Sequence, residues 1–188
     1  MTASTPTLEG APAMKNETFG MYLFLLAEVM FFAALASVYT VLRLGAPEWI
    51  TAPVTAVAYA NLGVLLASGV TMGLGVRAIR REDPIGLRIH LGLTMLLGTA
   101  FLGAQVYEFL RVGRDIPLST VYGSVFYVFS SLHGLHVLGG LIFLGSILVR
   151  GFQGKYNRYS HLGVTLAGLY WYLVVLVWVF LFLALYIY

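Results

Sequence analysis

The chain has 188 residues, of which 60% are hydrophobic and only 10% are charged, and its formal net charge is +3. Because soluble domains carry about 25% charged residues, this composition, with a mean hydropathy of +0.87, excludes an ordinary soluble fold and indicates an integral membrane protein. The chain has no cysteine. Disulfides, thiolate-bound copper and iron–sulfur clusters are therefore excluded, and nothing in the composition supports nucleic-acid binding.

Five apolar stretches are long enough to cross a bilayer, which takes about 20 helical residues. They cover residues 18–44, 53–79, 85–112, 120–149 and 159–188. Each is apolar throughout instead of alternating with period two, which disfavours a membrane β-barrel. We predict an all-α bundle of five transmembrane helices in one membrane domain, 18–188, after a mobile tail, 1–17. The tail has no basic segment before an apolar one, so we expect the first span to be retained.

The basic residues divide unequally between the two sides of the membrane. Arg43, Arg111 and Arg114 lie on one side, and the other side collects the remaining eight: Lys15, Arg77, Arg80, Arg81, Arg88, Arg150, Lys155 and Arg158. Because the richer side is retained in the cytoplasm, we predict a cytoplasmic N-terminus and an external C-terminus.

The first span carries a carboxylate, Glu28. If the span enters at Thr18, Glu28 lies about 15 Å deep, near the middle of a hydrocarbon core of about 30 Å. Ionisable residues at this depth are costly and usually functional. We therefore expect a buried, protonated Glu28 that donates a hydrogen bond. A purely structural tie between two helices is the alternative.

The second span presents Gly69 and Gly73 on a face suited to close helix packing, and the third carries Glu108 near its outer end. Glu108 lies within one turn of Arg111 and two turns of Arg114, so we expect an interfacial ion pair with one of them. Three tryptophans with several tyrosines indicate in part an aromatic belt: Trp49, Trp171 and Trp178.

The fourth span carries His133 and His136, about 20–24 Å from its outer entry at 1.5 Å per residue. His136 is thus expected to share a polar layer with Glu28. The other histidines, His90 and His161, begin the third and fifth spans. The four show no convergent set of haem ligands, so we predict no metal site in this chain.

Several strings, in order, resemble subunit III of the haem–copper respiratory oxidases over nearly the whole chain from Phe19. Residues 20–32 surround Glu28, which stands in the place of the family's carbodiimide-reactive carboxyl. Residues 101–108 resemble the third span, residues 126–140 resemble the paired-histidine segment, and Tyr170-Trp171 with Trp178 resembles the last helix. The second span adds three further matches: Asn61, Ser68 and Thr71.

The resemblance implies the short five-helix form of a non-catalytic subunit in a bacterial-type inner, or cytoplasmic, membrane. Such a subunit packs against catalytic subunit I of a cytochrome c or quinol oxidase and supports assembly, lipid binding and sustained proton uptake during aerobic electron transport. Haem and copper are expected in partner subunits, with phospholipid bound to this chain. The resemblance makes Glu28 the proton-active carboxyl, and it makes His133, His136 and Arg150 the residues that contact a lipid headgroup.

The last helix departs from the family pattern. Thr165, Tyr172 and Val175 stand where family members usually carry Glu, His and Asp. Three alternatives stay open at this point: an accessory subunit of a nitric oxide reductase, a membrane haem protein, and a small transporter with a midplane glutamate. The transporter is disfavoured because the spans show no inverted repeat.

Overall fold

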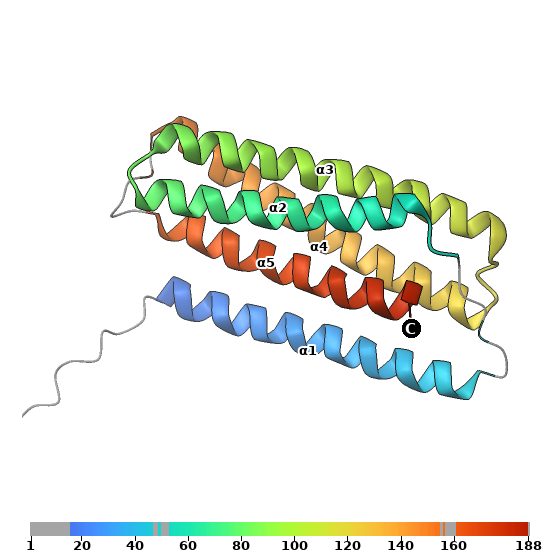
Figure 1. The fold of residues 1–188 in the computed structure, drawn as a ribbon. Helices are drawn as coiled ribbons and strands as arrows, with labels where there is room; N and C mark the ends of the chain where they lie inside the picture. The colour runs from blue at the N-terminus through green and yellow to red at the C-terminus, as the bar shows by residue number, and fades with distance from the viewer. Residues whose placement is uncertain (1–15, 47–48, 50–52, 155, 157–160, 188) are drawn as a thin grey trace, which may run out of the picture.

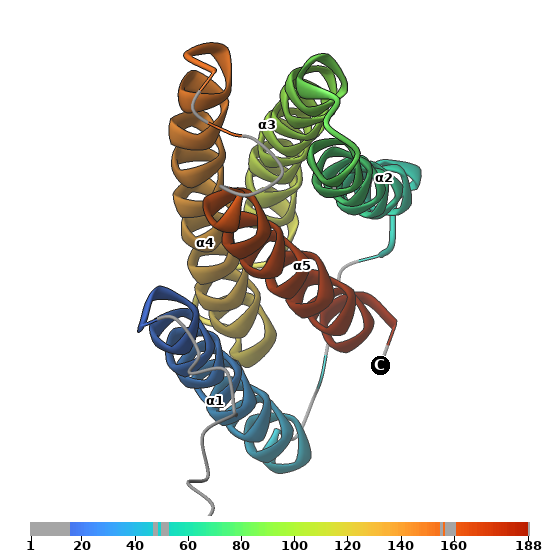
Figure 2. The same ribbon diagram turned by 90° about the vertical axis from the view of Figure 1, so that its left-hand side faces the viewer.

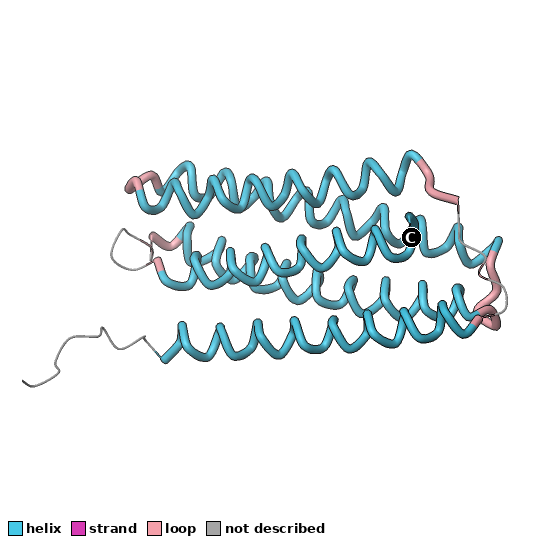
Figure 3. The backbone as a smooth tube through the Cα atoms, turned by 60° about the horizontal axis from the view of Figure 1, so that its bottom comes forward, coloured by secondary structure: helices cyan, strands magenta, loops and turns pink. Residues whose placement is uncertain are grey.

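A computed structural model of the chain describes residues 16–46, 49, 53–154, 156 and 161–187. Its elements are five long helices that run roughly parallel or antiparallel to one another, and no strand occurs in the described residues (Figure 1, Figure 3). All five are long and apolar enough to cross a membrane. The predicted all-α bundle of five spans is confirmed. The predicted tail, 1–17, falls almost entirely outside the described residues, as do Lys15, Lys155 and Arg158.

The helix boundaries lie within a few residues of the predicted spans. A short π-helical turn at the end of the last helix, η1 (Leu183–Ile187), was not predicted. The five helices are α1 (Asn16–Gly45), α2 (Ala56–Arg80), α3 (Pro84–Asp115), α4 (Val121–Phe152) and α5 (Leu162–Phe182).

Local capping explains where three of these helices begin. The side chains of Thr55 and Thr120 accept hydrogen bonds from backbone N–H groups in the first turns of α2 and α4. Asp83 does the same for α3, with Pro84 at the first helical position, where its missing N–H costs nothing. The turn between α2 and α3 is tight, and Glu82 within it has a left-handed φ of 62°.

Helices α2 to α5 form a closed core in which α2 packs on α3 and α5, and α4 packs on α3 and α5. Viewed nearly end-on, α1 lies to one side of this group, against α4 and α5 (Figure 2). Only Phe32 and Tyr39 of α1 are buried.

Trp171 lies at the centre of the core, where glycines make room for its ring. A Cβ atom placed on Gly98 of α3 would lie 2.7 Å from the Trp171 ring, and one on Gly140 of α4 would lie 3.0 Å from it. Trp171 and Trp178 are both about 0–1% exposed. For these two residues the predicted aromatic belt is wrong: Gly98 and Gly140 admit the Trp171 ring into the bundle, and Trp178 packs inside it against Phe101 and His133.

Candidate functional site

Glu28 and His136 meet across the interface of α1 and α4. Their contact joins Glu28 Oε2 to His136 Nε2 at 2.8 Å. The side chain of Glu28 is 18% exposed and that of His136 is 21% exposed, so the pair sits at the edge of the bundle, partly open to its surroundings. The predicted shared polar layer is confirmed, although Glu28 is only partly buried in this chain.

The hydrogen bond made by the other ring nitrogen of His136 determines how many protons the Glu28–His136 pair holds. His136 Nδ1 lies 2.7 Å from the backbone carbonyl oxygen of Leu132, and a carbonyl can only accept, so Nδ1 carries a proton. His136 Nε2 therefore either accepts a hydrogen bond from a protonated Glu28 or donates one, as imidazolium, to the Glu28 carboxylate. Both forms are neutral overall and place one proton between Nε2 and Oε2.

Two phenylalanine rings of α1 lie beside the His136 imidazole. The ring centroids of Phe32 and Phe31 lie 5.0 and 6.1 Å from that of His136. From α5, Tyr170 donates a hydrogen bond to the backbone carbonyl of His136 at 2.9 Å. This third helix in the site was not predicted, because no local sequence signal links Tyr170 to a residue 34 positions away.

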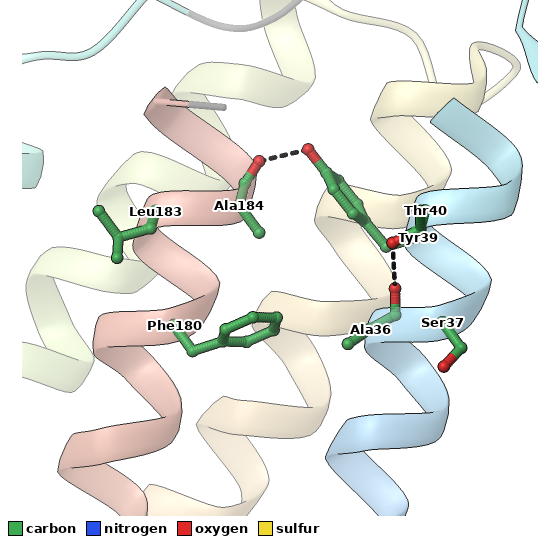
Figure 4. A pocket seen from close by; sticks show the side chains of 7 residues that line it. All are labelled: Ala36, Ser37, Tyr39, Thr40, Phe180, Leu183 and Ala184. Carbon is green, nitrogen blue, oxygen red and sulfur yellow. Dashed lines mark hydrogen bonds between the residues drawn. The ribbon is translucent and has the colours of Figure 1, made fainter. Parts of the chain in front are cut away.

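Two shallow grooves continue from the pair along the seam between α1 and α5. The nearer one, of about 370 Å³, is lined by apolar side chains that include Phe32, Ala33 and Val177. The next, of about 460 Å³, ends at Tyr39, whose hydroxyl donates to the carbonyl of Ala184 in η1 (Figure 4). Apart from Ser37 and Thr40, the seam is thus apolar between two polar contacts.

Glu108 forms a separate ion pair inside the core, near the C-terminal end of α3. Arg111 lies 3.1 Å from Glu108 Oε2, which confirms that Glu108 pairs with one of the two predicted arginines. Thr55 donates to Glu108 Oε1 at 2.7 Å, and Arg111 also donates to the carbonyl of Pro53. The Glu108 carboxylate is fully enclosed and accepts hydrogen bonds on both oxygens, which is the arrangement of a structural clamp between α2 and α3.

Three further contacts between buried polar side chains tie core helices together. Asn61 donates to Gln105 at 3.2 Å, and Trp171 donates to Ser68 at 3.0 Å. The last contact joins Thr71 to Thr94 at 2.8 Å. Sequence reasoning placed Asn61, Ser68 and Thr71 in the packed bundle but did not identify their partners.

The structure does not bring His133 or Arg150 to the Glu28–His136 pair. His133 is fully buried one turn from His136, where its ring stacks on Trp178 with 4.8 Å between centroids. Arg150 lies 14 residues beyond His136, or about 21 Å along α4, and is exposed. Among the described residues, no three His, Asp or Glu side chains form a group that could hold a metal ion.

Comparison with known proteins identifies the family. A family model described as cytochrome c oxidase subunit III matches residues 6–188. The cytochrome c oxidase subunit 3 of Synechocystis sp. is 38% identical over 174 residues, which cover 90% of this chain and 74% of the relative. That of Bacillus subtilis is 32% identical over 188 residues, covering 96% and 88%, and that of Petromyzon marinus is 34% identical over 186, covering 94% and 71%. The chain belongs to the cytochrome c oxidase subunit III family.

Proposed function

We propose that this chain is a non-catalytic subunit of a haem–copper terminal oxidase in a bacterial-type cytoplasmic membrane, with its N-terminus in the cytoplasm. In this role it packs against the catalytic subunit, which carries haem and copper, and supports assembly, lipid binding and sustained proton uptake. The names of its relatives and its five spanning helices support this proposal. These relatives give no support to a nitric oxide reductase subunit or a small transporter.

The observation that carries the proposal is the Glu28–His136 contact. It places a carboxyl and an imidazole 2.8 Å apart at the middle of two spans, with one proton between them and partial access from outside the bundle. Intramembrane ionisable pairs of this kind occur where proteins handle protons or bind charged groups. We assign Glu28 as the proton-active carboxyl and His136 as its partner.

Lipid contact is assigned to His136 and Arg150, both of which reach the surface of the chain. A headgroup at Arg150 would sit at the end of α4, with its acyl chains running along the helix toward His136. His133 is left out of this assignment because it has no exposed surface.

Labelling with a hydrophobic carbodiimide tests the role of Glu28, because this reagent attacks protonated carboxyls in apolar surroundings. In the oxidase complex, wild-type chain is expected to be labelled, and Glu28→Gln is expected to assemble without labelling. Glu108→Gln is the matched control and should keep full labelling. If Glu28→Gln is labelled as strongly as the wild type, the reactive carboxyl is another residue, and Glu108 is the first candidate. Failure of Glu28→Gln to assemble would mean that an ionised Glu28 is required.

Co-purification tests the wider assignment. A tagged chain is expected to bring down a haem–copper catalytic subunit, and the chain isolated from it is expected to be colourless. Haem or copper bound in stoichiometric amount to the isolated chain would contradict the proposal.

A further inference from the structure

A groove between α2 and α5 lies away from the Glu28–His136 pair, at the end of the bundle where most basic residues gather. Its volume is about 440 Å³. The side chains that line it come from the last turns of α2 and from one tyrosine of α5: Gly73, Val76, Arg77, Arg80 and Tyr172.

The polar groups of this groove are all hydrogen-bond donors that the rest of the described chain leaves unused. No hydrogen bond or ion pair joins Arg77, Arg80 or the Tyr172 hydroxyl to another described residue. Two carboxylates follow the arginines in the sequence, Glu82 and Asp83, and neither lines the groove. Asp83 accepts the backbone N–H of Gly86 and caps α3. Two guanidinium groups with five N–H donors each therefore face the groove without a carboxylate in its lining.

The donors lie at two depths. Arg77 and Arg80 are in the last turn of α2, whereas Tyr172 reaches the groove beside Gly73, where a Cβ atom would lie 2.6 Å from the Tyr172 hydroxyl oxygen. Gly73 thus makes room for the phenol. Gly73 precedes Arg80 by seven residues, which is about 10 Å along the helix. Two positive charges are followed, deeper in the span, by one neutral donor.

This order matches the chemistry of a glycerophospholipid. A phosphodiester between the two guanidinium groups would leave the ester carbonyls below it, at the depth of the neutral phenol, and the acyl chains would continue along the apolar helices. A free phosphate ion could use only the upper level. Basic pockets between transmembrane helices on the cytoplasmic side bind anionic lipid headgroups. We propose that Arg77, Arg80 and Tyr172 form a binding site for an anionic glycerophospholipid.

The site goes beyond the proposed function and shares no residue with the α1–α4 pair; it rests on the proposed function only in that its test uses the oxidase complex. It also gives a role to Tyr172, where the family usually carries a histidine. The test uses the oxidase complex in phosphatidylcholine nanodiscs that contain phosphatidylglycerol with a diazirine near its glycerol. After irradiation, the label on α2 and α5 peptides of this chain is measured.

The double variant Arg77→Gln/Arg80→Gln is expected to lower this labelling about 25-fold, because each basic residue near an anionic surface contributes about a fivefold gain in binding. The control Arg81→Gln/Arg114→Gln removes the same charge outside the groove and should label like wild type. Tyr172→Phe should reduce labelling several-fold, since it removes one hydroxyl and keeps the ring. Equal labelling of the two double variants would overturn the proposal.

Competition on the wild-type complex separates lipid from ion. Unlabelled phosphatidylglycerol should displace the probe, whereas inorganic phosphate and excess phosphatidylcholine should not. If inorganic phosphate displaces the probe at the same concentration as unlabelled phosphatidylglycerol does, the groove binds a free anion. That result would overturn the lipid site. If the double variant does not assemble, Tyr172→Phe and this competition still decide the outcome.

Discussion

Helix α1 and the four-helix core are built on different principles. In α1, 6% of the apolar span is buried within the chain, against 44% in α2 and 50% in α5. The core is fixed by the fully buried Trp171 set against two glycines, and by an enclosed ion pair. Between described residues, helix α1 is attached to the core by a few buried rings and by polar contacts that include Glu28 with His136 and Tyr39 with Ala184.

This difference has an energetic consequence. An exposed apolar helix face costs little in a bilayer, because lipid tails are as apolar as leucine side chains, so helix association depends on close packing and hydrogen bonds. The core has many close contacts and can lose one with limited change in its arrangement. Since α1 has few, loss of one polar contact should shift its position while the core stays intact.

The largest expected effect is in the core, at the buried carboxylate. Arg111→Met leaves Glu108 enclosed without its cation, and breaking a buried ion pair in this way costs about 3 kcal/mol or more. The free energy of unfolding in mixed micelles measures the loss. Arg114→Met, in the exposed last turn of the same helix, is the control and should cost little. If both variants lose the same free energy of unfolding, Arg111 stabilises the chain only through its positive charge and not through its pairing with Glu108.

A second core variant tests packing around Trp171. Gly98→Ala places a methyl group 2.7 Å from a ring that cannot move, whereas Gly103→Ala on the same helix meets nothing within 4 Å. Overpacking costs about 1–3 kcal/mol, and the gain in helix propensity is the same in both variants. The difference in unfolding free energy between them should therefore fall in that range. If the two variants are equally stable, the close fit at Trp171 is not what holds the core.

At the attachment of α1, Glu28→Leu should have a smaller effect on stability. It removes the contact with His136, and interhelical hydrogen bonds in membranes contribute about 0.6 kcal/mol on average and at most about 1.7. The variant should increase proteolysis or hydrogen exchange in α1 and leave α2 to α5 unchanged. Met30→Leu, at an exposed position of α1, should behave like wild type. A loss of protection throughout the core would contradict the separation of the two regions.

The smallest expected effect is that of Tyr39→Phe. This change removes the hydroxyl that donates to Ala184 but keeps the buried ring, and the cost should be about 0.6 kcal/mol. Tyr22→Phe, on an exposed face of α1, should cost less. Hydrogen exchange at the end of α1 and in η1 is the readout. An effect larger than that of Glu28→Leu would make Tyr39 the main attachment.

Sequence reasoning predicted depth along each helix but not rotation about it. The rise of 1.5 Å per residue indicated that Glu28 and His136 share a polar layer within the membrane, and the two residues do meet. It could not predict that Trp171 faces inward, because α5 is apolar on every side and its periodicity marks no buried face. The partners of Asn61 and Ser68 were missed for the same reason. Gly98 and Gly140 determine which way the Trp171 ring points, and they lie on other helices, so no local pattern reveals them.

The central claim is that the Glu28–His136 contact holds α1 against a core that is stable without it. The chain has no native cysteine, so spin labels can be placed on paired cysteines and their separation measured by electron double resonance. One pair, Ala34→Cys with Ser146→Cys, joins α1 to α4. The other, Thr99→Cys with Ser146→Cys, lies within the core. All three positions are exposed.

In the Glu28→Leu background, the α1–α4 distance distribution should broaden while the core distribution keeps its mean and width, and Glu28→Gln should leave both nearly unchanged. An α1–α4 distribution in Glu28→Leu that matches wild type would contradict the claim.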